Sequence, residues 1–391
     1  MVVLEVVFWL CVALIVWTQL GYALALAALV RIRAIALPAQ RKDSHRPPLE
    51  DGVPDPHVTL IVAAHDEQDV IGAKIADALA LDYPRELLQL IVACDGCTDA
   101  TAERARRAGA DLVLELPRAG KVRAQDSAVE RATGAIVAFS DANSHWEPGA
   151  LRELLSAFAD PRVGYACGQV RFVQGAVGAN ASNQEGLYWR YELAVRSLES
   201  RLSSITAGNG AIYATRRDAY IVVDPIMGHD LSLPFNIVKR GLRAVYVPTA
   251  RASEKMVPSL LGEFQRKRRM MSHTWPIVLR GGMLSPRGYP PLYALMIFSH
   301  RLLRYATPGL HALALAANVA LVVIGAGPVY VVTLALQLAL LLAALLAGAL
   351  RARPLLLARY YVLTTASPAA GLYDWLRHGT PAWWDAAEGT R

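Results

Sequence analysis

Four short clusters of acidic and polar residues stand out in the central part of the chain. The clusters are His65-Asp66-Glu67, Cys94-Asp95-Gly96-Cys97-Thr98-Asp99, Ser140-Asp141-Ala142-Asn143 and His229-Asp230. Each of the first three follows a short apolar run, and open α/β sheets bind their ligands beyond the carboxyl ends of their strands. Carboxylates gathered at one such edge suit a divalent cation together with a sugar-nucleotide.

Two of these clusters also have a structural interpretation. Thr98 or Asp99 would cap a following helix, although capping does not account for Asp95 at the end of the preceding apolar run. Asp141 and Asn143 are alternate residues at a strand end, so their oxygens can converge on one Mg²⁺ or Mn²⁺ ion beside two phosphates. Asp and Asn are equally common in turns. The argument for chemistry therefore depends on finding three acidic strand ends in one sheet.

A second set of polar residues lies further along the chain. Asp230 falls outside the first three clusters and suits a general base that faces an acceptor hydroxyl, or else it is a solvated loop carboxylate. His229 would tune that acid or contact the acceptor. Gln265, Arg268 and Arg269 have helical spacing. Arginine matches phosphate geometry, so these residues either stabilise a diphosphate leaving group or form a basic face at a membrane surface.

The elements that must position the first three clusters alternate between two types. Short apolar runs predict strands, and runs with helical spacing predict helices. The expected strands are 57–64, 88–94, 111–115 and 135–140, and the expected helices are 68–81, 98–108 and 121–132. This alternation predicts βαβ units, and hence an α/β fold with a Rossmann-like, mostly parallel sheet.

Long apolar segments flank the predicted sheet. Val6 to Val30 exceeds the ~20 residues that cross a bilayer. Glu5 before it and basic residues after it favour an anchor over a cleaved signal peptide, with the next domain cytoplasmic. Tyr305 to Leu350 has no Asp, Glu, Lys or Arg, and Gly325-Ala326-Gly327-Pro328 interrupts it, which predicts two membrane helices. Residues 355–375 either span the membrane or lie in its interface.

These features predict five parts of the chain. Residues between the first anchor and the sheet are rich in Pro and charge, as in a linker, and those before the second apolar region interleave basic and apolar types, as in helices at the headgroup plane. The parts are an N-terminal transmembrane anchor (1–33), a linker (34–56), a cytoplasmic catalytic domain (57–257), interfacial amphipathic helices (258–304) and a C-terminal transmembrane region (305–391).

Composition agrees with a membrane protein. Hydrophobic residues make up 54% of the chain and the mean hydropathy is +0.29, high for a purely soluble protein. The net charge of +7 could indicate nucleic acid, but the basic residues gather beside the apolar segments. Membrane lipids are therefore the expected partner, and no nucleic acid is expected. Four cysteines give no disulfide framework, and the pair Cys94 and Cys97 lacks a second pair for zinc.

In order and spacing, the motifs resemble those of glycosyltransferase family 2, the inverting enzymes with a GT-A fold. The resemblance is strongest to the membrane-anchored branch, which includes the cellulose, hyaluronan and poly-N-acetylglucosamine synthases. Six segments carry it, namely Val62-Ala63-Ala64-His65-Asp66-Glu67, the run from Ala93 to Thr101, Gly120-Lys121, Ser140-Asp141-Ala142-Asn143, Gly228-His229-Asp230 and Gln265-Arg266-Lys267-Arg268-Arg269-Met270.

The resemblance implies a role for each matched residue. For nucleotide-sugar binding it implies Ala63, His65, Glu67, Asp95, Lys121, Asp141 and Gln265. For the metal it implies Asp141 and Asn143, and for catalysis Asp230 as the base with Arg268 and Arg269. The chain departs from the family pattern at three positions, because Asn143 replaces the second Asp of the metal motif, His229 replaces an acidic residue, and Arg269 replaces a Trp at the acceptor end.

The sequence thus predicts an integral membrane, inverting glycosyltransferase that depends on Mg²⁺ or Mn²⁺. It would transfer a sugar from a UDP- or GDP-sugar to a lipid-linked or polysaccharide acceptor. The Trp replacement leaves two readings open, a single transfer or a processive polysaccharide synthase subunit. A non-catalytic membrane scaffold is a further alternative. A nucleotidyltransferase is disfavoured, because His65-Asp66-Glu67 stands where such enzymes carry a Gly-rich basic loop.

Overall fold

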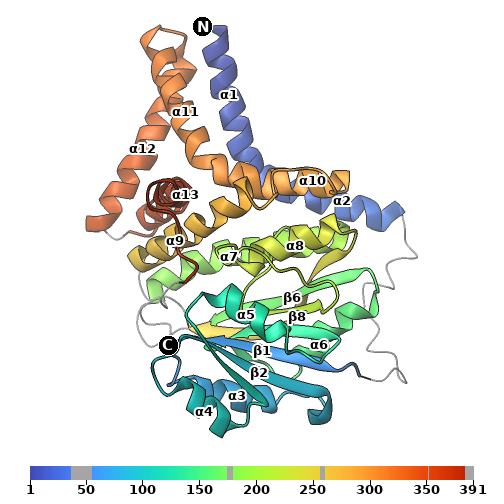
Figure 1. The fold of residues 1–391 in the computed structure, drawn as a ribbon. Helices are drawn as coiled ribbons and strands as arrows, with labels where there is room; N and C mark the ends of the chain where they lie inside the picture. Colours follow the sequence, from blue (N-terminus) through green and yellow to red (C-terminus); the bar gives the residue numbers. More distant parts are fainter. Residues whose placement is uncertain (37–54, 174–178, 256–259, 351, 384–391) are drawn as a thin grey trace.

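An α/β domain carries a bundle of apolar helices on one side (Figure 1). This arrangement comes from a computed structural model, which describes residues 1–36, 55–173, 179–255, 260–350 and 352–383. Most of the predicted linker (34–56) lies outside the described residues.

The first half of the domain has the predicted βαβ pattern. Its strands are β1 (Val58–Ala64), β2 (Leu88–Asp95), β3 (Leu112–Leu116) and β4 (Ile136–Asp141), and its helices are α3 (Ile71–Leu79), α4 (Thr101–Ala108) and α5 (Lys121–Val129). All four strands pair in parallel, in the order β3-β2-β1-β4. Helices cover both faces, so the strands are buried and read as continuous apolar runs.

The second half extends the same sheet. It contains β5 (His145–Trp146), α6 (Ala150–Ser156), β6 (Val163–Val173), α7 (Ala179–Leu202), β7 (Ile212–Arg216), α8 (His229–Lys239) and β8 (Arg243–Lys255). The full order is β3-β2-β1-β4-β7-β6-β8-β5, in which β7 runs antiparallel to both of its neighbours. The predicted fold class, an α/β domain of GT-A type with a mostly parallel sheet, is therefore confirmed.

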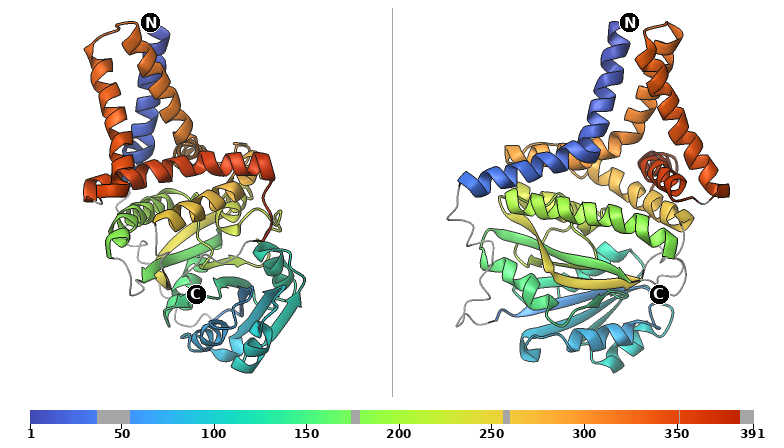
Figure 2. Two further views of the ribbon diagram at one scale, coloured as in Figure 1. Left: turned by 90° about the vertical axis from the view of Figure 1, so that its left-hand side faces the viewer. Right: turned by 180° about the vertical axis from the view of Figure 1, so that it is seen from behind.

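Among the described residues, three helical stretches are long and apolar enough to cross a membrane, Val2–Ala36, Pro291–Val323 and Pro328–Leu350. The first comprises α1 (Val2–Val16), a π-helical turn (Trp17–Gly21) and α2 (Tyr22–Ala36). At this turn the chain changes direction, so that α1 enters the bundle and α2 lies across its base (Figures 1 and 2).

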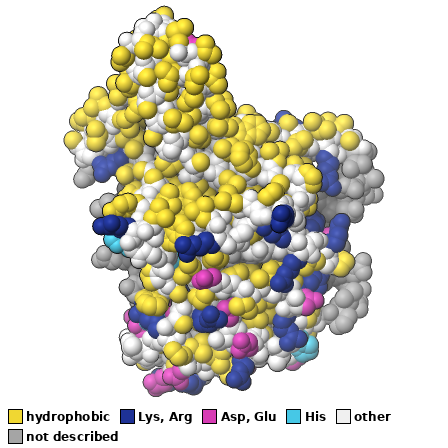
Figure 3. All heavy atoms as spheres, turned by 45° about the horizontal axis from the view of Figure 1, so that its top comes forward, with side chains coloured by type: hydrophobic (Ala, Val, Ile, Leu, Met, Phe, Trp, Pro, Cys, Tyr) yellow, Lys and Arg dark blue, Asp and Glu magenta, His cyan; other side chains and the backbone are white. Residues whose placement is uncertain are grey.

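The second apolar region forms the helical hairpin that the glycine-proline interruption predicted. After α10 (Pro291–Met296) and a second π-helical turn, α11 (Leu303–Val323) rises beside α1, and α12 (Pro328–Leu350) returns. Apolar side chains cover this bundle, while Lys and Arg side chains gather on the domain below it (Figure 3).

The C-terminal helix α13 (Arg353–His378) contains residues 355–375, which were expected either to span the membrane or to lie in its interface. It is not among the described helices that could cross a membrane, and it lies across the base of the bundle (Figure 2). There it packs on α9 (Leu260–Leu279), where the indole of Trp275 donates to the carbonyl of Pro368 at 2.8 Å. Gly371 lets the two backbones approach, because an added Cβ would lie 2.8 Å from the carbonyl oxygen of Arg268. The structure favours the interfacial alternative.

A buried polar cluster fastens the membrane helices to the domain. Glu199 on α7 is fully buried and accepts hydrogen bonds from Tyr22 at 2.7 Å and from Thr206. His300, from the π-helical turn before α11, lies 2.7 Å from the same carboxylate. Because a buried carboxylate is costly unless it is fully bonded, this cluster fixes the bundle relative to the sheet.

We expect the chain beyond α13 to lie on the same side of the membrane as the catalytic domain. A membrane-impermeant maleimide should label Trp383→Cys from the side that carries the domain, and should label Val323→Cys, at the tip of the bundle, only from the opposite side. Cys97→Ser provides the background, because the other three native cysteines are buried. Labelling of both positions from one side would contradict this topology.

Candidate active site

The strand ends meet at one edge of the sheet, as predicted. Ala63 pairs with Asp141 across β1 and β4, while Ala64 pairs with Cys94 across β1 and β2. The ring of His65 lies 2.7 Å from the carbonyl oxygen of Asp95. Parallel register therefore brings three of the four acidic clusters together, because β1, β2 and β4 end at the same level.

Asp95 fixes the loop that leads into α5. Its side chain is 6% exposed, and its carboxylate accepts the backbone N–H groups of Ala119 at 2.6 Å and Gly120 at 3.0 Å. These bonds satisfy the buried carboxylate and set the start of α5, which begins with Lys121. In this structure Asp95 thus shapes the nucleotide side of the site through the backbone, and its direct contact with a nucleotide stays a prediction.

Lys121 and Asp141 form an ion pair at the centre of this edge. The ammonium of Lys121 donates to a carboxylate oxygen of Asp141 and lies 3.4 Å from the carbonyl oxygen of Gly210. Both side chains are about one-third exposed, at 28% and 31%. A positive charge already occupies the position beside Asp141, so the oxygens of Asp141 and Asn143 have the chemistry and surroundings that suit a hard cation.

The turn Gly208-Asn209-Gly210 joins the two halves of the site. Asn209 shapes it by accepting the N–H groups of Ala211 and Ile212. At Gly210 an added Cβ would lie 3.1 Å from the Lys121 ammonium, so the turn passes close to the end of this side chain. At the other end the N–H of Gly208 donates to the carbonyl of Asp230 at 2.7 Å.

Asp230 is the second residue of α8 and is partly exposed. Its carboxylate lies over Gly228, where an added Cβ would be 2.7 Å from one carboxylate oxygen. The buried phenol of Tyr213 is close to both Asp141 and Asp230. Burial raises its pKa well above the usual value, and the negative charges of these two carboxylates raise it further. Asp230, the predicted base, and Asp141, the predicted metal ligand, thus both lie near the ring of Tyr213.

His229 points away from any acceptor. Its ring is 4% exposed and lies 3.0 Å from the hydroxyl of Tyr213 and 3.3 Å from that of Tyr220. Burial lowers its pKa to about 3, so the ring is neutral. The expectation that His229 contacts the acceptor is wrong, because the ring faces the sheet and anchors the start of α8.

The two arginines of α9 face different neighbours. Arg268 makes two hydrogen bonds of 2.6 Å to Asp374 on α13, and these bonds raise the pKa of its guanidinium. Arg269 faces His273, one turn further along. Burial lowers the pKa of His273, the charge of Arg269 lowers it further, and that of Asp230 acts in the opposite sense. Arg268 is thus engaged in holding α13, whereas Arg269 lies near enough to His273 for their charges to interact. The role of Arg269 at the leaving group stays a prediction. Gln265 is exposed.

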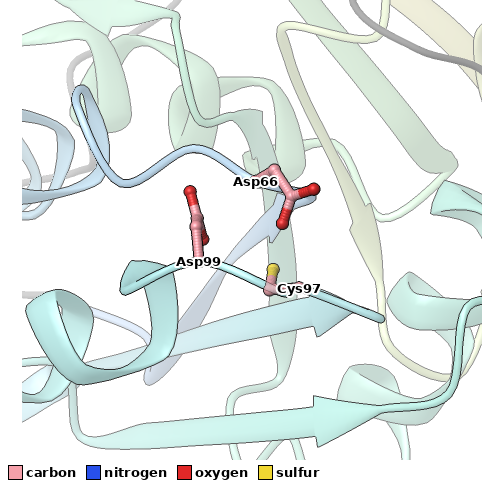
Figure 4. A group of neighbouring side chains, drawn as sticks. All are labelled: Asp66, Cys97 and Asp99. Atoms are coloured by element: carbon pink, nitrogen blue, oxygen red, sulfur yellow. The ribbon is translucent and has the colours of Figure 1, made fainter.

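A further group of possible metal ligands lies where the loops after β1 and β2 meet. The carboxylates of Asp66 and Asp99 and the thiol of Cys97 lie within 4.8 Å of one another (Figure 4). Asp99 accepts the N–H of Thr101 at 3.0 Å, and Asp66, which has a φ of +49°, accepts the N–H of Thr98 at 2.7 Å. These bonds tie the loop after β1 to the loop after β2, so we assign the group a structural role.

Two contributors to this region have no clear signal in the sequence. Glu254 is the penultimate residue of β8, and its half-buried carboxylate interacts with the charge of Asp141. Its strand lies in the half of the domain where hydrophobic periodicity is weak. The second is the segment after α13, where Thr380 donates to the carbonyl of Ser272 at 3.1 Å. From there the chain descends to the loop before α5, and the carbonyl of Ala382 lies against Gly120.

We expect Gly120→Ala to disturb this region by two separate effects. Gly120 has a φ of +95°, and an added Cβ would overlap the carbonyl oxygen of Ala382. The substitution should lower the free energy of unfolding by about 1–3 kcal/mol, measured by denaturant titration in detergent. Gly241→Ala is the matched control, because Gly241 has a φ of +82° and open space around it. Equal losses in both variants would show that the Ala382 contact contributes nothing.

Comparison with known proteins agrees with this geometry. The family described as "Glycosyltransferase like family 2" matches residues 54–272. A beta-monoglucosyldiacylglycerol synthase from Synechocystis sp. is 31% identical over 174 residues, which are 42% of this chain and 35% of that protein. An N-acetylglucosaminyltransferase from Mesorhizobium japonicum is 25% identical over 55% of each chain. The chain thus spans between about a third and about half of the length of these curated relatives.

Among solved structures, a mannosyltransferase from Pyrobaculum calidifontis, solved in complex with GDP-Man and Mn²⁺, has a similar fold. Its TM-score is 0.62 with 24% sequence identity, and the alignment covers 91% of this chain and 98% of that one. The similarity extends beyond the sheet to the membrane helices, since so much of both chains is aligned. Because the family match covers more than half of the chain and contains all the clusters described above, the protein belongs to the glycosyltransferase-like family 2.

Proposed function

We propose that this protein is a membrane-bound inverting glycosyltransferase that transfers one sugar from a nucleotide-diphospho-sugar to a lipid-linked or glycan acceptor. The observation that carries the proposal is the turn Gly208-Asn209-Gly210. One end of it contacts Lys121 and Asp141, and the other end holds the backbone of Asp230. A donor-binding cluster and a lone carboxylate are thereby held at a fixed separation, as in-line displacement requires.

In the proposed reaction Asp230 acts as the general base. Its carboxylate takes the proton of an acceptor hydroxyl as the oxygen attacks the anomeric carbon. The bond from that carbon to the diphosphate breaks on the opposite side, so the configuration inverts and the nucleoside diphosphate leaves. Lys121 and Arg269 supply positive charge toward the departing diphosphate, where negative charge develops.

Asp141 and Asn143 would hold the divalent cation. A bound Mg²⁺ or Mn²⁺ would neutralise charge on the diphosphate. The Lys121 ammonium, which lies on Asp141 in this structure, supports the assignment because it shows that this carboxylate attracts a cation. The Mn²⁺ in the structure of the archaeal mannosyltransferase supports a divalent metal as well.

The position of Asp230 favours an acceptor at the membrane. Asp230 begins α8, which lies in the layer directly below the interfacial helices (Figure 1). His273 of α9 lies close enough to Asp230 for the negative charge of Asp230 to oppose the lowering of the His273 pKa. The Synechocystis relative is named as the synthase of a glucosyldiacylglycerol, which supports a lipid acceptor. We place the catalytic domain on the cytoplasmic side, from the basic residues that follow the first apolar segment.

Asp230→Asn should abolish transfer while leaving donor binding intact. The amide is nearly isosteric but cannot accept the proton, so kcat should fall by about 10²- to 10⁴-fold. Purified enzyme with membrane lipid extract and a panel of UDP- and GDP-sugars gives the rate, and nucleotide titration gives donor affinity. Asp224→Asn, an exposed neighbour on the same loop, is the control. Near-normal turnover in Asp230→Asn would remove this residue from the base role.

The two arginines should separate in the same assay. Arg269→Met should lower kcat by about a hundredfold, because a charge directed at the leaving group is lost. Arg268→Met breaks a partly exposed pair with Asp374, so kcat should stay within a factor of about five while α13 becomes more accessible to protease. The reverse order of effects would restore Arg268 as the leaving-group residue.

A further inference from the structure

Glu254 lies beside the proposed metal motif although it comes from the other end of the sheet. In β8 the neighbouring Ser253 pairs with His145 of β5, and this pairing places Glu254 level with Ser144. Ser144 closes the turn that begins at Asp141, because its N–H lies 3.2 Å from the Asp141 carbonyl oxygen. The last strand of the domain therefore returns its penultimate side chain to the loop that carries Asp141 and Asn143.

Glu254 is half-buried, and one of its two carboxylate oxygens lacks a partner in the described part of the chain. One of its oxygens has no solvent exposure and no hydrogen-bond partner among the described residues. An ionised oxygen in that state is expensive, and native structures rarely keep one without a ligand or an ion. A bound cation would therefore stabilise this oxygen, to which no described side chain donates a hydrogen bond.

The charges around Glu254 agree with a cation site beside its carboxylate. Burial, followed by the negative charge of Asp141, raises the pKa of Glu254, while the positive charges of Lys121, Arg266 and Lys74 lower it. The two lysines have other acceptors. Lys74 is buried and donates to the Ser144 carbonyl at 2.7 Å, and Lys121 donates to Asp141. The negative charges of Glu254 and Asp141 therefore interact, and neither lysine is hydrogen-bonded to Glu254.

We propose that Glu254 supplies the second carboxylate of the divalent-cation site, in place of the acidic residue that Asn143 replaces. The inference rests on the proposed function, since it assumes that Asp141 and Asn143 hold the cation. A hard cation prefers anionic oxygen, and Asp141 with Asn143 offers one carboxylate and one amide. Glu254 restores the second negative charge, and the cation in turn relieves the repulsion between the two carboxylates.

A competing role for Glu254 is to balance the buried charge of Lys74. Lys74 lies 5.3 Å from the Trp146 ring centroid and is 1% exposed, and burial lowers its pKa to about 8. In that case Glu254→Gln would reduce thermal stability, Lys74→Met would restore it, and metal affinity would not change. Metal affinity is therefore the readout that separates the two roles.

The test measures Mn²⁺ binding rather than turnover. Full-length protein in detergent is titrated with Mn²⁺ in the presence of UDP or GDP, and free Mn²⁺ is read from its electron paramagnetic resonance signal. Glu254→Gln should weaken Mn²⁺ binding at least about tenfold, with nucleotide affinity in EDTA unchanged. Glu147→Gln is the matched control, because Glu147 lies near the same strand but is 47% exposed and pairs with Arg171.

A rescue variant tests whether the lost Mn²⁺ affinity depends on the missing carboxylate. Asn143→Asp in the Glu254→Gln background returns a carboxylate to the motif and should recover most of the lost Mn²⁺ affinity. Glu254→Asp, which keeps the charge, should bind Mn²⁺ more tightly than Glu254→Gln, and it replaces that variant if the latter does not fold. Equal Mn²⁺ affinity in wild type and Glu254→Gln would overturn this inference alone. Absence of Mn²⁺ binding by the wild type would overturn the proposed metal site as well.

Discussion

The site depends on one backbone constraint, the turn at Gly208-Asn209-Gly210. The N–H of Gly208 donates to the backbone carbonyl of Asp230, and the carbonyl of Gly210 lies 3.4 Å from the side-chain ammonium of Lys121, so this one turn contacts both halves of the site. Asn209 fixes the turn by bonding to β7 and, through its amide, to the Gly168 carbonyl on β6. β7 is the antiparallel strand that joins the two halves of the sheet. The turn that contacts both parts of the site therefore lies where the two halves of the fold meet.

The sequence predicts the nucleotide half of the domain well, because each acidic cluster directly follows a buried strand. Once β1, β2 and β4 are recognised as parallel, His65, Asp95 and Asp141 must converge. It predicts the other half less well. Spacing places Arg268 and Arg269 on one helix but cannot say which faces α13, since Asp374 lies far along the chain. The sequence does not reveal Glu254, because β5, the strand that brings it level with Ser144, is only two residues long and leaves no periodic signal.

The membrane helices do more than anchor the domain. Tyr22, Glu199 and His300 bring α2, α7 and the start of the α10–α11 segment to one buried point. Because α7 also precedes the glycine turn, the distance from bundle to site is set by packed, hydrogen-bonded structure. A long lipid held against the bundle would then present its head group at a constant depth. The interfacial position of α13 agrees with this arrangement, since α13 packs on α9 between Arg268 and Trp275.

The Lys121–Asp141 pair bears directly on the proposed reaction. If a divalent cation took the Asp141 oxygen that accepts the Lys121 ammonium, the lysine would need another anionic acceptor. A diphosphate offers the lysine new anionic oxygens within the same cluster, and the exchange conserves charge. The Ala382 carbonyl lies against Gly120, the residue before Lys121, so the C-terminal segment borders the position at which α5 begins.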